Sequence, residues 1–132
     1  RSQLLGKNCF VHSSVVFRKD AAQKVDGYDE TVSTRHVEDW DLWLRLGREG
    51  VLANIPTYSV SWMLRDGNIS STNKLSQFKK GIALVHAYKK SYPGYYAALV
   101  RSYLRYGIYG VVMNTPIRPL LMRGIAWYKK HW

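Results

Sequence analysis

Acidic residues are missing from the second half of this chain. Residues 74–132 contain eleven Lys and Arg but no Asp or Glu, whereas residues 1–73 contain nine residues of each sign. The formal net charge of +11 therefore comes entirely from the C-terminal part. We place a boundary near Asn73, between a balanced segment, residues 1–73, and a basic, aromatic-rich tail, residues 74–132, that we expect to be helical.

Cysteine is nearly absent. Cys9 is the only one among 132 residues, so the chain forms no internal disulfide and offers no cysteine cluster for a metal. We find no repeat, no low-complexity tract and no signal peptide. The first residue is Arg1 rather than Met, so we expect a fragment or a processed product. The length suits one domain, and 46% apolar residues suffice for a core.

Recognisable nucleic-acid-binding motifs are missing as well. Eighteen aromatic residues and a charge of +11 would suit stacking on bases and contacts with phosphates. The sequence contains no zinc finger or RNA-recognition signature, and we expect no nucleic-acid partner. An anionic membrane surface is the stronger alternative for residues 74–132, since each Lys or Arg near such lipid contributes about 1 kcal/mol. A merely solvated basic face is the third possibility.

The apolar pattern of the first part predicts strands alternating with helices. Residues 9–17, CFVHSSVVF, are nearly continuous in apolar and small residues and predict a buried strand. Residues 51–55 and 57–65 predict two more strands. Residues 18–25 predict a short helix ended by the Asp26-Gly27 turn, and a loop follows it. This order predicts a mixed α/β layer.

Helical spacing is clearest in three later segments. Residues 38–49 carry Trp40 and Trp43 on one side, and Gly50 is well placed to end that helix. The tail begins with an amphipathic helix whose apolar residues are spaced by three and four: Leu75, Phe78, Ile82 and Val85. Pro93-Gly94 separates it from a second helix, Tyr95–Met113. Two arginines inside this second helix, Arg101 and Arg105, make crossing a bilayer costly, so we expect it to lie on a surface or to be packed.

The adjacent acids Glu38 and Asp39 admit two interpretations. Acids in a first helical turn stabilise the helix by about 0.3–1 kcal/mol each, and taken alone these residues favour this capping role. A carboxylate held rigidly at the edge of a cleft can instead act as a general base, which contributes about 10²–10⁴-fold in rate. Asp41 and Arg45 form an ordinary i, i+4 helix pair.

Three segments in this order resemble family 2 glycosyltransferases of the GT-A fold. They are NCFVHSSVVFRKDAAQKVDGYDE (8–30), EDWDLWLRLGREGVLANIP (38–56) and DGNISS (66–71). The resemblance covers about half of the chain. It implies an α/β fold, in which residues 1–73 are the acceptor-side half of a GT-A domain and residues 74–132 are a helical tail. It also implies sugar transfer from a nucleotide-sugar donor with inversion, in polysaccharide or glycan biosynthesis.

The resemblance makes Asp39 the catalytic base, with Glu38 as its neighbour. It places Arg65 in a loop where many relatives carry a His, and an arginine there would bind diphosphate but would not ligate a metal. Trp40 is a candidate to stack on the acceptor sugar, although core packing is the alternative for Trp40 and the preferred role for Trp43.

Two further acceptor-site candidates flank the acidic pair. His36 stands two residues before Glu38, and Asp29 belongs to the Gly-Tyr-Asp-Glu loop. Each has a structural alternative, as a surface group or a turn residue. We expect His12, a lone histidine, to be a structural or surface group.

The family's nucleotide-binding half and its DXD metal motif lie outside this sequence. We therefore expect a fragment that is inactive alone, and a divalent Mg or Mn ion whose ligands come from elsewhere. The expected partners are a nucleotide-sugar donor, a saccharide or lipid-linked acceptor and an anionic membrane surface. The expected location is the cytoplasm or the inner face of the cell membrane. A non-catalytic basic module that binds membrane or nucleic acid is the alternative function.

Overall fold

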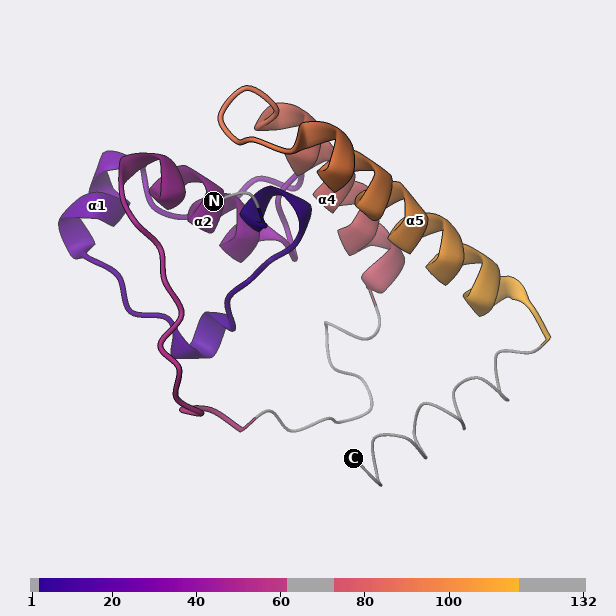
Figure 1. The fold of residues 1–132 in the computed structure, drawn as a ribbon, viewed down its shortest axis with the longest axis horizontal. Helices are drawn as coiled ribbons and strands as arrows, with labels where there is room; N and C mark the ends of the chain where they lie inside the picture. Colours follow the sequence, from indigo (N-terminus) through magenta and orange to yellow (C-terminus); the bar gives the residue numbers. More distant parts are fainter. Residues whose placement is uncertain (1–2, 62–72, 117–132) are drawn as a thin grey trace.

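The computed structural model describes residues 3–61 and 73–116, and every regular element in these ranges is helical (Figure 1). Two are single 3₁₀ turns, η1 (Leu4–Gly6) and η2 (His12–Ser14). The four α-helices are α1 (Lys19–Lys24), α2 (Glu38–Glu49), α4 (Lys74–Ala87) and α5 (Tyr95–Asn114). The helices expected from the apolar spacing near residues 38–49, 75–85 and 95–113 are thus confirmed, while residues 117–132 of the expected helical tail lie outside the described ranges.

The predicted α/β layer is wrong, because the described residues contain no strand. Residues 9–17 form the turn η2 between irregular segments, and residues 51–61 run without regular structure, while residues 62–65 lie outside the described ranges. A strand exists only where its backbone N–H and C=O groups pair with a neighbouring strand. Residues 9–17 make local turn bonds instead, such as Ser14 N–H to Val11 O at 2.9 Å.

Several of the apolar residues that suggested buried strands are exposed to solvent, whereas Cys9, Phe10, Val15 and Leu52 are partly buried against the core. Val16 is 96% exposed and Ile55 is 81% exposed. These side chains are apolar, as a buried strand would require, but no described segment packs over them. The mixed α/β class is therefore replaced by an all-helical arrangement in the part of the chain that the structure describes.

Helix α2 lies at the centre of the core. It begins with Glu38, Asp39 and Asp41 in its first turn, where negative charge complements the helix dipole. Most of its remaining side chains are buried, which is the pattern of a helix covered on nearly all sides. The buried apolar residues of the core are Leu4, Leu5, Val37, Trp40, Leu42, Trp43, Leu44, Leu46, Leu84, Val85, Tyr92 and Ala98.

Helices α4 and α5 form a hairpin beside α2, and α5 runs along the outer edge of the molecule (Figure 1). Gly94 allows the tight connection, because its φ of +80° is a left-handed conformation that other residues rarely adopt. Across the hairpin, the rings of Phe78 and Tyr109 meet edge to face at 5.5 Å. None of the helices in the described ranges has both the length and the hydropathy needed to cross a membrane.

A close approach of α2 to α4 depends on glycine. A Cβ atom on Gly81 would lie 2.8 Å from Cζ3 of Trp40, too near for an unstrained contact. The same indole also contacts η1, because its Nε1 donates a 2.8 Å hydrogen bond to the carbonyl of Leu4. Trp40 therefore joins η1, α2 and α4.

Candidate functional site

The carboxylate of Asp39 lies at the start of α2, half-buried, in an orientation set by two hydrogen bonds. Its Oδ1 accepts the N–H of Trp40 at 2.7 Å, and its Oδ2 accepts the side-chain amide of Asn8 at 2.8 Å. Asn8 is itself oriented, since its Oδ1 accepts the N–H of Phe10 at 3.1 Å. The first bond is a capping contact within the helix. The second fixes the carboxylate from a segment 31 positions away.

Tyr28 and His12 form a pair within reach of the negative charges of Asp39 and Glu38. The Tyr28 hydroxyl and Nε2 of His12 share a 3.0 Å hydrogen bond, and the two rings stack with centroids 5.6 Å apart. Burial raises the pKa of the Tyr28 phenol, and the negative charges of Asp39 and Glu38 raise it further. Tyr28 therefore stays protonated and can donate a hydrogen bond at neutral pH.

Glu38 contributes a buried oxygen to the same region. Its Oε2 is covered and has no hydrogen-bond partner among the described residues. Buried carboxylate oxygens normally accept at least one hydrogen bond, so this atom is suited to a donor such as a hydroxyl group. We use the name Asp39 cluster for Asn8, His12, Tyr28, Glu38 and Asp39, which come from three separate segments of the chain.

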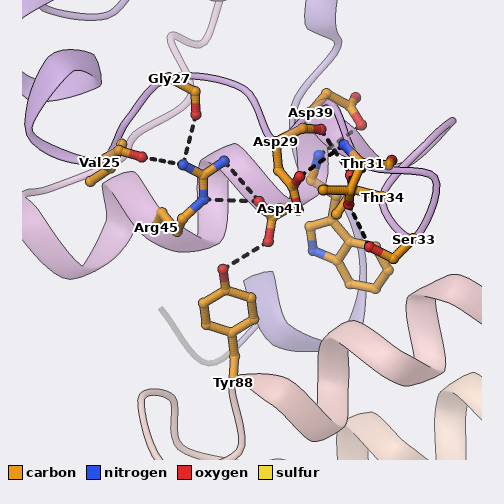
Figure 2. Close-up of polar contacts among 11 residues, drawn as sticks. Val25, Gly27, Asp29, Thr31, Ser33, Thr34, Asp39, Asp41, Arg45 and Tyr88 are labelled. Carbon is orange, nitrogen blue, oxygen red and sulfur yellow. Dashed lines mark hydrogen bonds and ion pairs between the residues drawn. The ribbon is translucent and has the colours of Figure 1, made fainter.

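Asp29, an expected acceptor-site residue, holds a turn together. Its Oδ1 accepts the N–H of Thr31 at 2.9 Å, and its carbonyl accepts the hydroxyl of the buried Thr34 at 2.8 Å (Figure 2). The Thr31 N–H, followed by the Thr31 hydroxyl, holds the pKa of the Asp29 carboxyl below its ordinary value. These contacts use Asp29 to shape the loop that leads to α2.

The loop before α2 is also fixed from α4. Lys80 Nζ donates to the carbonyls of Val32 and Arg35, at 2.6 and 2.8 Å. His36 follows directly, with a φ of +74° in the left-handed region that non-glycine residues seldom occupy. Lys80 thus determines where the chain turns into Glu38 and Asp39.

Trp40, the expected sugar-stacking residue, lies in the core and is 8% exposed. Its contacts with Gly81 and Leu4 leave the indole little surface for a ligand. Trp43 is 1% exposed and meets the rings of Phe10 and Phe17 edge to face. The structure therefore gives Trp40 the core-packing role that was also preferred for Trp43.

A buried polar network is centred on Asp41, two residues after Asp39 in the first turn of α2 (Figure 2). Asp41, 5% exposed, accepts hydrogen bonds from Arg45 Nε at 2.8 Å and from the Tyr88 hydroxyl at 2.7 Å. Arg45 also donates through Nη1 to the carbonyls of Val25 and Gly27. The expected i, i+4 pair is confirmed, and its partners show that it ties α2 to α4 and to the turn after α1.

Two further expectations concern the diphosphate and the metal ion. Arg65 lies outside the described residues. Within the described ranges, no three His, Cys, Asp or Glu side chains lie close enough to hold a metal ion. A trough of about 580 Å³ lies between residues 9–17 and 51–60 beside Trp43, away from Asp39.

Local patterns did not single out three members of the cluster. Asn8 and Tyr28 lie within the segments that carry the resemblance, and His12 was expected to be structural. Nothing in the spacing of the sequence indicates that Asn8 bonds to Asp39 or that Tyr28 pairs with His12. No protein-family model, curated protein or solved structure matches this chain.

Proposed function

We propose that this chain carries the acceptor side of an inverting, nucleotide-sugar-dependent glycosyltransferase, with Asp39 as the general base. The observation that carries the proposal is the Asn8–Asp39 hydrogen bond of 2.8 Å, which orients a half-buried carboxylate at the start of the central helix. The proposal does not depend on an α/β layer. It rests on the Asp39 cluster and on the order of the three sequence segments.

The reaction needs one general base, and Asp39 has this role. Asp39 accepts the proton of an acceptor hydroxyl while that oxygen attacks the anomeric carbon of the donor. The bond from that carbon to the nucleoside diphosphate breaks on the opposite face, and the diphosphate leaves with the electron pair. Stereochemistry is therefore inverted.

Two neighbouring groups are suited to holding the acceptor. Glu38, which is half-buried, would accept a second hydroxyl of the sugar through its carboxylate, and the protonated Tyr28 would donate to a sugar oxygen. A saccharide, free or linked to lipid, provides several hydroxyls on one ring and matches this set. Donor-binding groups, and any divalent ion, would be contributed by residues outside this chain.

The test is nucleoside diphosphate release by the intact protein that contains this chain, measured over a panel of nucleotide sugars and saccharide acceptors. Asp39→Asn should lower the turnover number by about 10²-fold or more, because the amide cannot accept the proton. The thermal midpoint and the KM for the donor should stay close to those of the parent. Glu49→Gln, at the exposed end of the same helix, is the matched control.

Asn8→Ala separates orientation from mere capping. Loss of the Asn8 amide should lower the turnover number by about tenfold while the donor KM is unchanged, since the base remains but is no longer held. If Asp39→Asn lowers only the thermal midpoint and turnover is near normal, Asp39 is a capping residue and the proposal is wrong.

A further inference from the structure

The outward side of α5 is a continuous apolar stripe. Its members recur every three or four residues, so they share one helix face, and each is more than half exposed. We call this set the outer face of α5: Tyr96, Val100, Tyr103, Leu104, Ile108 and Val111. The opposite side of the helix is buried through smaller residues, Ala98 and Ser102. The helix thus presents its larger apolar side chains to solvent.

Arginines border this stripe. Arg101 and Arg105 line one shallow hollow together with Val100, Leu104 and Ile108 of the outer face. Arg105 is held in place, because its Nη1 donates a 3.0 Å hydrogen bond to the carbonyl of Gly6. Helix α5 contains no acidic residue, and neither does the rest of residues 74–132. The surface therefore combines apolar side chains with uncompensated positive charge.

We propose that the outer face of α5 docks onto an anionic lipid bilayer and lies in its interface. Soluble proteins rarely expose a contiguous apolar surface of this kind without a partner. Helices with an apolar face and flanking cations bind at the boundary between headgroups and acyl chains. Tyr96 and Tyr103 are residues that favour this depth. Arg101 is exposed, although its Nη1 lies near Gly6, and we expect it to supply positive charge for lipid phosphates.

Charge distinguishes the bilayer from a second copy of this chain. In a symmetric dimer the same patch meets itself, so Arg101 and Arg105 of both copies would be brought to one interface to which α5 contributes no acid. Anionic lipid supplies the opposite charge over the whole face. The aliphatic side chains of Val100, Leu104 and Ile108 also suit hydrocarbon better than the polar surface of a nucleic acid.

The test is sedimentation of the full chain with phosphatidylcholine vesicles, with and without phosphatidylglycerol. Binding should require phosphatidylglycerol and weaken as salt is added. The double variant Leu104→Asn/Ile108→Asn should bind at least tenfold more weakly, because two inserted side chains are lost. Arg101→Gln should bind about fivefold more weakly, which corresponds to about 1 kcal/mol for one cation.

Matched controls exclude general effects of these substitutions. Ile55→Asn replaces an 81% exposed isoleucine outside α5, and Arg48→Gln removes an exposed arginine from α2. Both should bind vesicles like the parent protein. Circular dichroism and the thermal midpoint should show that every variant is folded.

Four results would overturn the proposal. Equal sedimentation with pure phosphatidylcholine would remove the role of charge. Unchanged binding by the Leu104→Asn/Ile108→Asn variant would assign binding to another part of the chain. A dimer in analytical ultracentrifugation that dissociates in this variant would make the outer face a self-association surface. Absence of vesicle binding, with a large loss of thermal stability in the variant, would show that the chain itself covers the face.

Discussion

The Tyr88 hydroxyl donates a 2.7 Å hydrogen bond to the carboxylate of Asp41, joining the end of α4 to the buried side of α2. Asp41 also forms an ion pair of 2.8 Å with Arg45. A buried carboxylate is tolerated only when its lone pairs are satisfied, and here two elements provide the donors. The junction between α2 and α4 therefore depends on the side chain of Asp41.

Replacement of Asp41 by Asn should lower the free energy of unfolding by about 1.5–3 kcal/mol, the range for a hydrogen bond to a charged group. Arg45 would keep its charge but lose its ionic partner. Urea denaturation followed by circular dichroism measures this cost. The control is Glu49→Gln, an exposed change that should alter stability by less than about 0.5 kcal/mol. Equal costs for the two variants would refute the role of the network.

Stability should fall at alkaline pH because of Tyr88. Burial raises the pKa of its phenol above the ordinary value of about 10, and the hydrogen bond to Asp41 and the charge of Asp41 add to the shift. Below pH 10 the phenol is protonated in both states, so its contribution is fully present. Above pH 10 the unfolded chain loses this proton first, and the free energy of unfolding declines.

Tyr88→Phe should remove this part of the decline, so that the variant loses less stability than the parent between about pH 9 and pH 11. Denaturation at a series of pH values measures the difference. Tyr103→Phe, on the exposed side of α5, is the control and should follow the parent curve. Parallel curves for the parent and Tyr88→Phe would contradict the assignment.

Two glycine substitutions should have opposite effects. Gly81→Ala places a methyl group against the buried ring of Trp40 and should destabilise the fold by about 1–3 kcal/mol. Gly107→Ala meets nothing within 4 Å and should stabilise α5 by about 0.5–1 kcal/mol, as expected for Ala in a helix interior. Thermal unfolding of the two variants measures both signs. A stabilised Gly81→Ala protein would disprove the close contact of α2 with α4.

Lys80 should control the order of the loop before Asp39. Lys80→Met retains much of the aliphatic side chain but removes both hydrogen bonds to the carbonyls of Val32 and Arg35. Amide hydrogen exchange in residues 31–37 should become faster, because local opening no longer breaks these bonds. Lys79→Met, on an exposed position of the same helix, should leave the exchange unchanged. Equal exchange in both variants would show that Lys80 does not hold the loop.

Local sequence patterns were sufficient for the helices. Acids at Glu38 and Asp39, apolar spacing through α2 and Gly50 after it define a helix within one short segment. The Pro93-Gly94 pair likewise separates α4 from α5 without help from distant residues. Such signals act between near neighbours, which is why they can be read without a structure.

Only the tertiary structure showed that the expected strands do not form in the described residues and which residues meet at the site. Residues 9–17 have the composition of a strand, but pairing requires a second segment at the correct distance, and composition carries no such distance. For the same reason the sequence could not show that Asn8 meets Asp39 or that Trp40 packs against Gly81. Helices arise from contacts along the chain, whereas strands and this site arise from contacts across it.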